Sequence, residues 1–436
     1  MPSALQGALV SSTKSLTPPI SGWRQWANRY PVALIALAQL FGTSLWFTPN
    51  AVLAPMLESW SFTSDSAAAL GQLTSSVQGG FIVGTLALGL AGLADRFAAR
   101  HLFMVSCVLG ALTNLALLIA PGLLSASSLR VLTGLALAGI YPIGLKLMLQ
   151  SAPDRAGAAL AWLVGMLVLG TSLPHALAAL QQSGGLSLSW GTAIVMASLL
   201  ALTGAGLIAL LAPPPVAQTA NPPPSSGITP GSSTFLARAT RGMAAWQYPG
   251  FVRGALGYFG HMWELYTLWA LVPWLLSRMA SATGMTLTPA TLALHSFIVI
   301  AVGAPGCIAG GWVSRKRGSL WVARLGLAGS VTLTLCFVAA MQLEAGYGLL
   351  FCLLALWSLL AAIDSPQFSA LAAGGTPVEL QASALALMNA CGFSLSLVSI
   401  ALLTPLIASH GTLLLLTLLP GPLLGLLALA RRVDPA

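Results

Sequence analysis

Charged side chains are scarce in this chain of 436 residues. Asp, Glu, Lys and Arg together make up 6% of the sequence, whereas hydrophobic residues make up 57%. A soluble domain carries about 25% charged residues, so this chain cannot cover itself with a water-exposed surface and its main solvent is lipid. The net charge of +9 does not indicate a nucleic-acid partner, because the basic residues lie in loops between apolar runs.

Cysteine and the common catalytic motifs are also lacking. The five cysteines include no CxxC pair, and we interpret them as small packing residues with no disulfide or metal role. The sequence contains no GxxxxGK[ST], HExxH or GxSxG motif, which argues against an ATP-driven machine and against an enzyme. We therefore expect no cofactor and no metal. Residues 1–30 lack the apolar core of a signal peptide.

What the chain has instead is a series of long apolar runs. Only helices or closed barrels span lipid, and these runs are too long for barrel strands. We predict an all-α membrane protein with 12 transmembrane helices, arranged as two pseudo-symmetric six-helix bundles. The predicted spans are 31–57, 69–93, 102–121, 126–149, 157–181, 190–212, 251–277, 290–312, 320–342, 346–371, 381–403 and 409–430.

A segment rich in Pro, Ser and Gly separates the two sets of six runs. Its composition, with PPP at 213–215 and 222–224, is typical of a flexible or extended linker. The predicted organisation is a tail at 1–30, a bundle at 31–212, the linker at 213–247, a second bundle at 248–430 and a tail at 431–436.

Lys and Arg predict the orientation. If both termini are cytoplasmic, only Arg130 and Arg278 fall toward the outer side, and Lys146 lies within the fourth run. The remaining basic residues are then inside, as the positive-inside rule requires. We expect an integral protein of the plasma membrane, the inner membrane of a bacterium, with cytoplasmic termini.

The two halves repeat each other weakly but in order. Phe41-Gly42 with Pro55 matches Phe259-Gly260 with Pro273, at an offset of 218. Three further matches follow, between 95–96 and 314–315, between 139–142 and 362–366, and between 159–161 and 384–386. Parallel six-helix repeats with a binding site between them are a transporter architecture.

The loop after the second run carries a family resemblance. It reads Ala91-Gly-Leu-Ala-Asp-Arg-Phe-Ala-Ala-Arg100, and it resembles the G-x-x-x-D-R-x-G-[RK]-[RK] signature of the major facilitator superfamily, although Ala91, Ala98 and Ala99 depart from it. The fourth run contains Arg130-Val-Leu-Thr-Gly134, similar to the R-x-x-x-G motif of that superfamily. The resemblance implies a monomeric secondary transporter that works by alternating access. It also implies a gating loop that braces the two halves, with the matching positions Gly92, Asp95, Arg96 and Arg100.

Two acids and a histidine deep in the second half are candidates for proton coupling. An acid in mid-bilayer costs at least about 2.5–3.5 kcal/mol, so Glu264 needs a water-filled cavity, a partner or a proton. We expect it to face the central cavity, with His261 on the same helical face. Asp364 beside Pro366 is the third candidate. Locked hydrogen bonds between helices are the alternative for His261 and Glu264, and a partner such as Lys146 or a backbone group is the alternative for Asp364.

Other polar and aromatic residues are candidates for the substrate cavity. Under the offset of 218, Trp46 corresponds to Glu264, so we expect these two to face each other across the halves. Packing between helices and anchoring at the membrane interface are the alternatives for the aromatic members. The candidates are Gln39, Trp46, Asn50, Arg130, Tyr141, Trp263, Tyr266 and Asn389.

These residues favour a secondary active transporter of a small solute, with proton-coupled symport (uptake) as the leading hypothesis. The partners expected are the solute, protons and the lipid bilayer. Efflux by proton antiport is the alternative, although residues 165–174 lack the G-x-x-x-G-P-x-x-G-G run of many exporters. A membrane sensor or scaffold that does not transport is the alternative from another class. The sequence does not name the solute.

Overall fold

The computed structural model describes residues 29–61, 66–90, 93–152, 156–183, 189–211 and 235–430, and these ranges contain helices and turns but no strand. The first half contains α2 (Pro31–Thr43), α3 (Thr48–Ala51), α4 (Leu53–Ser59), α5 (Ser66–Leu90), α6 (Leu93–Arg96), α7 (Ala99–Leu115), η1 (Ala116–Ile119), α8 (Leu123–Ala138), α9 (Tyr141–Ser151), α10 (Ala156–Ser183) and α11 (Gly191–Leu210). The second half contains α12 (Phe235–Ala244), η3 (Ala245–Gln247), α13 (Pro249–Ala282), α14 (Pro289–Ala301), α15 (Gly303–Arg317), α16 (Ser319–Gln342), α17 (Tyr347–Ile363), α18 (Ser365–Gly374), α19 (Val378–His410), η4 (Gly411–Leu418) and α20 (Pro420–Ala430).

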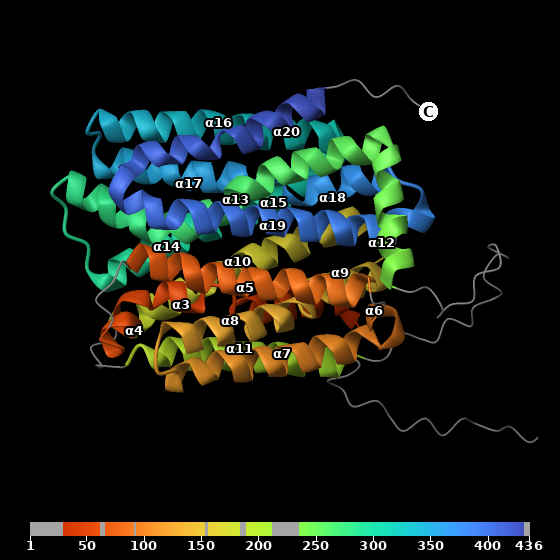
Figure 1. Cartoon of the computed structure of the whole chain (residues 1–436), viewed down its shortest axis with the longest axis horizontal. Coiled ribbons are helices and arrows are strands. Elements are labelled where there is room, and N and C mark those ends of the chain that lie inside the picture. Colours follow the sequence, from red (N-terminus) through yellow and green to blue (C-terminus); the bar gives the residue numbers. More distant parts are fainter. Residues whose placement is uncertain are drawn as a thin grey trace, which may run out of the picture.

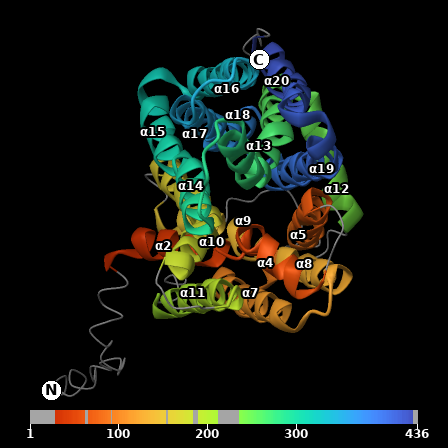
Figure 2. The same cartoon turned by 90° about the vertical axis from the view of Figure 1, so that its left-hand side faces the viewer.

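The helices form two bundles that lie against each other. Figure 1 shows most of them running in a common direction, and Figure 2 shows α2–α11 on one side and α13–α20 on the other. The bundles meet along two lines, where α5 packs on α19 and where α10 packs on α14 and α15. The predicted all-helical membrane fold in two six-helix bundles is confirmed.

Several predicted spans are interrupted, and a proline follows each interruption. The first span is broken at residues 44–47, before Pro49, and the fourth is broken at 139–140, before Pro142. The tenth span is broken at Asp364, before Pro366. Proline has no N–H for the carbonyl four residues earlier and its ring clashes with that carbonyl, so the sequence itself places these breaks.

By length and apolar composition, nine helical stretches among the described residues are suited to cross a membrane. Three differences account for the number relative to the twelve predicted spans. The first span is broken, α13 carries polar residues such as His261 and Glu264, and the last two spans form one stretch, Val378–Ala430.

The end of the predicted linker is helical. Residues 235–247, which the composition assigned to the flexible segment, form α12 and η3. In Figure 1, α12 crosses the ends of the other helices. It packs on α19, where a Cβ at Gly242 would lie 2.8 Å from the Ser383 carbonyl oxygen. The flexible interpretation is wrong for this part because a glycine permits close packing on a helix distant in sequence. Residues 212–234 and both predicted tails, apart from Arg29 and Tyr30, lie outside the described residues.

Candidate functional site

A buried histidine–aspartate pair joins α13 to the break between α17 and α18. His261 Nδ1 lies 2.9 Å from Asp364 Oδ1, and the exposed fractions of the two side chains are 3% and 1%. The other ring nitrogen of His261, Nε2, lies 3.1 Å from the Ser365 hydroxyl. Because the two groups are within hydrogen-bond distance, a proton gained or lost by either one changes the charge of the pair.

A glycine provides the space for the Asp364 carboxylate. A Cβ at Gly326 of α16 would lie 2.8 Å from both Cγ and Oδ2 of Asp364. Neither Oδ1 nor Oδ2 makes a hydrogen bond of good geometry among the described residues, so the 2.9 Å approach of Oδ1 to His261 is an ion-pair contact. His261 therefore contacts the carboxylate through one oxygen, while the other oxygen remains available to accept a proton.

Glu264 lies one helical turn from His261 but has different partners. Its Oε1 accepts hydrogen bonds from the Ser330 hydroxyl at 2.5 Å and from the Trp357 indole N–H at 2.6 Å. A third, longer bond of 3.4 Å comes from the Thr334 hydroxyl. Glu264 is 2% exposed and is turned into its own bundle, toward α16 and α17. The prediction that it faces the central cavity is wrong.

The side chain that meets Trp46 across the two halves is Tyr266, and not Glu264 as we expected. The Trp46 and Tyr266 rings stack, with centroids 5.5 Å apart. Two residues on a helix point about 200° apart, so a helix that turns Glu264 into its own bundle turns Tyr266 toward the other half. Phe81 and Phe393 complete the contact, with centroids 4.9 and 5.8 Å from Trp46. We call Trp46, Phe81, Tyr266 and Phe393 the central aromatic cluster.

Arg130 holds the break in the first span together. Its Nη1 donates to the Leu45 carbonyl at 3.0 Å, and its Nη2 donates to the Trp46 carbonyl. Leu45 is the carbonyl that Pro49 cannot bond, because it lies four residues earlier. The guanidinium is 1% exposed. The expectation that Arg130 lines the substrate cavity is wrong, since both terminal nitrogens donate to helix carbonyls; its Nε has no partner among the described residues.

The remaining cavity candidates in the first half lie at different depths. Gln39 is fully buried, its amide has no hydrogen-bond partner among the described residues, and its Oε1 would lie 2.2 Å from a Cβ at Gly144. Asn50 donates to the Thr74 hydroxyl at 3.0 Å. The Tyr141 ring stacks on Phe81, with centroids 6.5 Å apart. Tyr141 therefore adjoins the central aromatic cluster.

Two candidates in the second half have opposite positions. Asn389 is partly buried on α19, one turn before Phe393, so it lies on the helical face that carries the central aromatic cluster. The indole N–H of Trp263 donates to the Thr417 carbonyl at 3.0 Å, and the side chain lines a groove between α13, α19 and α20 together with Pro420 and Gly421. The prediction that Trp263 lines the central cavity is therefore wrong.

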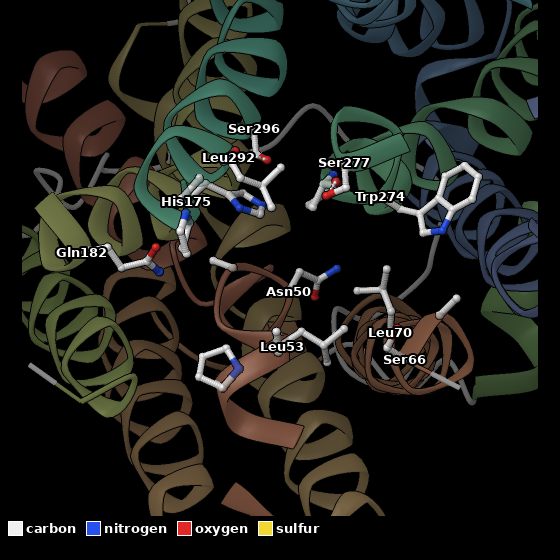
Figure 3. A pocket seen from close by; sticks show the side chains of 17 residues that line it. Asn50, Leu53, Ser66, Leu70, His175, Gln182, Trp274, Ser277, Leu292 and Ser296 are labelled. Carbon is white, nitrogen blue, oxygen red and sulfur yellow. Dashed lines mark hydrogen bonds between the residues drawn. The ribbon is translucent and has the colours of Figure 1, made fainter. Parts of the chain in front are cut away.

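A cavity of ≈ 360 Å³ lies between the halves, and we call it the vestibule. Figure 3 shows Asn50 at its middle, His175 and Gln182 on one side, and Trp274 and Ser277 on the other. The lining comes from α3, α4, α5, α10, α13 and α14. In Figure 1, α4 and α14 lie at the opposite end of the bundles from α6 and α12, so the vestibule is on the predicted outer side.

The predicted gating loop is described in part. Gly92 and the Asp95 side chain lie outside the described residues. Arg96 is exposed at the end of α6, and Arg100 Nη2 donates to the Ala209 carbonyl at the end of α11, at 3.4 Å. Arg100 therefore ties the loop to its own bundle.

Sequence reasoning missed the partners of the two acids. Ser330 and Thr334 are spaced i, i+4 in an apolar helix, which indicates one polar stripe on α16. No sequence pattern near Glu264 indicates that this stripe contacts it. Gly326 lies one turn before Ser330 on the same stripe. The buried amide side chain of Gln78 on α5 was also not identified from the sequence. Within the described ranges, no three His, Cys, Asp or Glu side chains come together in a group that could hold a metal ion.

The comparisons with known proteins agree with this architecture. The family model of the Major Facilitator Superfamily matches residues 33–430. In a sequence search against curated proteins, none matches this chain. Among solved structures, the nucleoside transporter NupG is similar, with a TM-score of 0.68 and 12% sequence identity, over 92% of this chain and 100% of NupG. At that identity the likeness shows the fold alone. The family match covers nearly the whole chain, so this protein belongs to the major facilitator superfamily and is a secondary transporter, not an enzyme.

Proposed function

We propose that this transporter couples the uptake of a small solute to the entry of protons, and that the His261–Asp364 pair carries the proton. The observation behind the proposal is the 2.9 Å contact between these side chains, buried at a helix break. The membrane is the inner membrane of a bacterium, with both termini in the cytoplasm.

The position of Asp364 links its charge to the helices. The residue is both the last cap of α17 and the first cap of α18. When the carboxylate is charged, it attracts the His261 ring and favours the positive N-terminus of α18. When it takes up a proton, both attractions weaken, and the angle between the two helices is free to change. Proton binding on one side of the membrane and release on the other thus accompany the rocking of the halves.

Glu264 has a positioning role in this scheme. One oxygen accepts three donors, and the Trp357 indole can only donate. The amide oxygen of glutamine can accept the same bonds. We therefore expect Glu264→Gln to keep proton coupling and Asp364→Asn to lose it.

Purified protein in proteoliposomes, with an internal pH-sensitive dye, tests the proposal. A solute that stabilises the protein in detergent is added outside, and its accumulation is measured with and without an inward proton gradient. We expect gradient-driven accumulation and solute-driven acidification in the wild type. In Asp364→Asn both disappear, while exchange of labelled for unlabelled solute remains, because exchange needs no net proton movement.

The matched control is Glu58→Gln, the same kind of change at an exposed acid of α4, which should leave coupling intact. Proton-driven accumulation that persists in Asp364→Asn would refute the assignment of the proton to this pair. Accumulation driven only by an outward proton gradient would show antiport in place of symport.

A further inference from the structure

The vestibule has no charged lining among the residues that the structure describes. Its polar groups are Asn50, Ser66, His175, Gln182, Ser277 and Ser296, and the rest of the wall is apolar. His175 is 2% exposed, and it borders the cavity beside Leu292 in Figure 3. A mostly apolar wall with a few polar groups is typical of a small-molecule site.

One face of α5 extends from the vestibule to the central aromatic cluster. Asn50 lines the vestibule and bonds Thr74, and Gln78 lies one turn further along α5 on the same face. Phe81 of the cluster comes three residues after Gln78. The side chain of Gln78 is fully buried, and neither its amide nitrogen nor its oxygen has a hydrogen-bond partner in the described ranges. The indole N–H of Trp46 is unpartnered in the same way.

These unpartnered groups are costly as they stand. A buried polar group without a hydrogen bond costs roughly 1–3 kcal/mol, and most such groups in native proteins have a partner. A ligand that hydrogen-bonds to Gln78 and Trp46 removes that cost, and aromatic faces next to them favour a flat ring.

The charged side chains nearest to this path are engaged elsewhere. Arg130 binds two helix carbonyls, Glu264 accepts bonds from α16 and α17, and Asp364 is paired with His261. An ionic solute would therefore lose its hydration without gaining a counter-charge, and burying an unpaired ion is far more costly than burying a neutral polar group.

We propose that the solute is uncharged and carries a flat ring with an amide-like edge that both donates and accepts hydrogen bonds. His175 and Asn50 bind it in the vestibule. Gln78 and the Trp46 N–H bind its edge at the centre, where Trp46 and Tyr266 part to receive the ring. The inference rests on the proposed transport function and names the substrate class of that site.

Matched probes that differ only in charge test the proposal. The melting temperature of the purified protein is measured at pH 7 with millimolar benzamide, benzoate and benzamidine, with the same three derivatives of naphthalene, and with cyclohexanecarboxamide. A ligand that binds the folded state raises the melting temperature. We expect the aromatic amides to raise it, with little or no shift from the carboxylates, the amidines or the non-planar amide.

Two variants assign the site. Gln78→Leu should lose the shift given by the amides, whereas the control Gln342→Leu, at an exposed residue at the end of α16, should keep it. Gln78→Glu, which keeps the shape and adds a negative charge, should transfer the shift from amide to amidine, so a poorly folded leucine variant does not decide the outcome. The proposal would be overturned if the carboxylate or amidine probes stabilised the wild-type protein. It would also be overturned if no aromatic amide stabilised it.

The melting-temperature test of the substrate class does not depend on whether transport is coupled to protons. An aromatic amide that binds but is not accumulated with protons contradicts the proposed function and leaves the substrate class intact. A charged solute that is accumulated with protons does the reverse.

Discussion

Arg130 provides the sharpest test of how the first bundle is held together. The break at residues 44–47 leaves the carbonyls of Leu45 and Trp46 outside the helical hydrogen-bond pattern, and Arg130 donates to both of them. Arg130→Met keeps most of the length of the side chain and removes both donors. Each buried acceptor left without a partner costs roughly 1–3 kcal/mol, so we expect a loss of roughly 2–6 kcal/mol in the free energy of unfolding.

The assay is thermal unfolding in detergent, combined with labelling of a cysteine introduced at Leu45. The melting temperature of Arg130→Met should fall by roughly 2–6 °C, and the thiol at position 45 should react faster than in the wild-type background. Arg130→Lys, which keeps the charge but offers a single nitrogen, should fall between the two. The control is Arg278→Met, a change of the same kind at an exposed residue of α13.

A melting temperature and labelling rate equal to those of the wild type would refute this reasoning. If transport were lost at the same time, Arg130 would contact the solute after all, because a loss of function without a loss of stability is what removal of a cavity residue produces.

Three further predictions follow from contacts in the second bundle. Trp357→Phe removes one donor from Glu264 and should lower stability by roughly 1–3 kcal/mol, seen as a lower melting temperature, while Trp162→Phe at an exposed site should have no effect; an equal fall in both variants would contradict the role of the hydrogen bond. Gly326→Ala places a Cβ 2.8 Å from the Asp364 carboxylate and should reduce proton-driven accumulation, whereas Gly348→Ala, with no atom within 4 Å, should not; unchanged accumulation in Gly326→Ala would count against the tight packing of the pair. Gly260→Ala should destabilise the protein more than the repeat-related Gly42→Ala, by roughly 1–3 kcal/mol. The new methyl group meets the Gly421 backbone oxygen in Gly260→Ala, but only the movable Ile140 side chain in Gly42→Ala. Equal melting temperatures of the two variants would show that the α13–α20 crossing can relax.

The residue types and their order along short stretches of the sequence were enough to predict the two six-helix bundles. Apolar runs of spanning length identify membrane helices because every backbone group in lipid must be bonded within the helix. The breaks near Pro49, Pro142 and Pro366 are local as well, since a missing N–H acts on a carbonyl four residues away. The relation between the halves was also visible in part, because Phe259-Gly260 repeats Phe41-Gly42.

The direction in which each side chain points, and the residues that it contacts, were not predictable from the sequence in this way. The sequence placed His261 and Glu264 on one face of one helix, and both are indeed turned toward α16–α18. It did not show that this face is the inside of the second bundle. The repeat led us to pair Trp46 with Glu264, whereas the residue that meets Trp46 is Tyr266, about half a turn around the helix.

The sequence by itself determined that this protein lies in the membrane as two similar bundles, and it identified the few groups that can carry charge there. Only the tertiary structure decided what each group does. Arg130 donates to a carbonyl at the break in the first span, and Glu264 accepts hydrogen bonds from Ser330 and Trp357. Asp364 contacts His261. The physical reason is that hydropathy and proline act within a few residues, whereas the rotation of each helix is set by packing against helices far away in the chain.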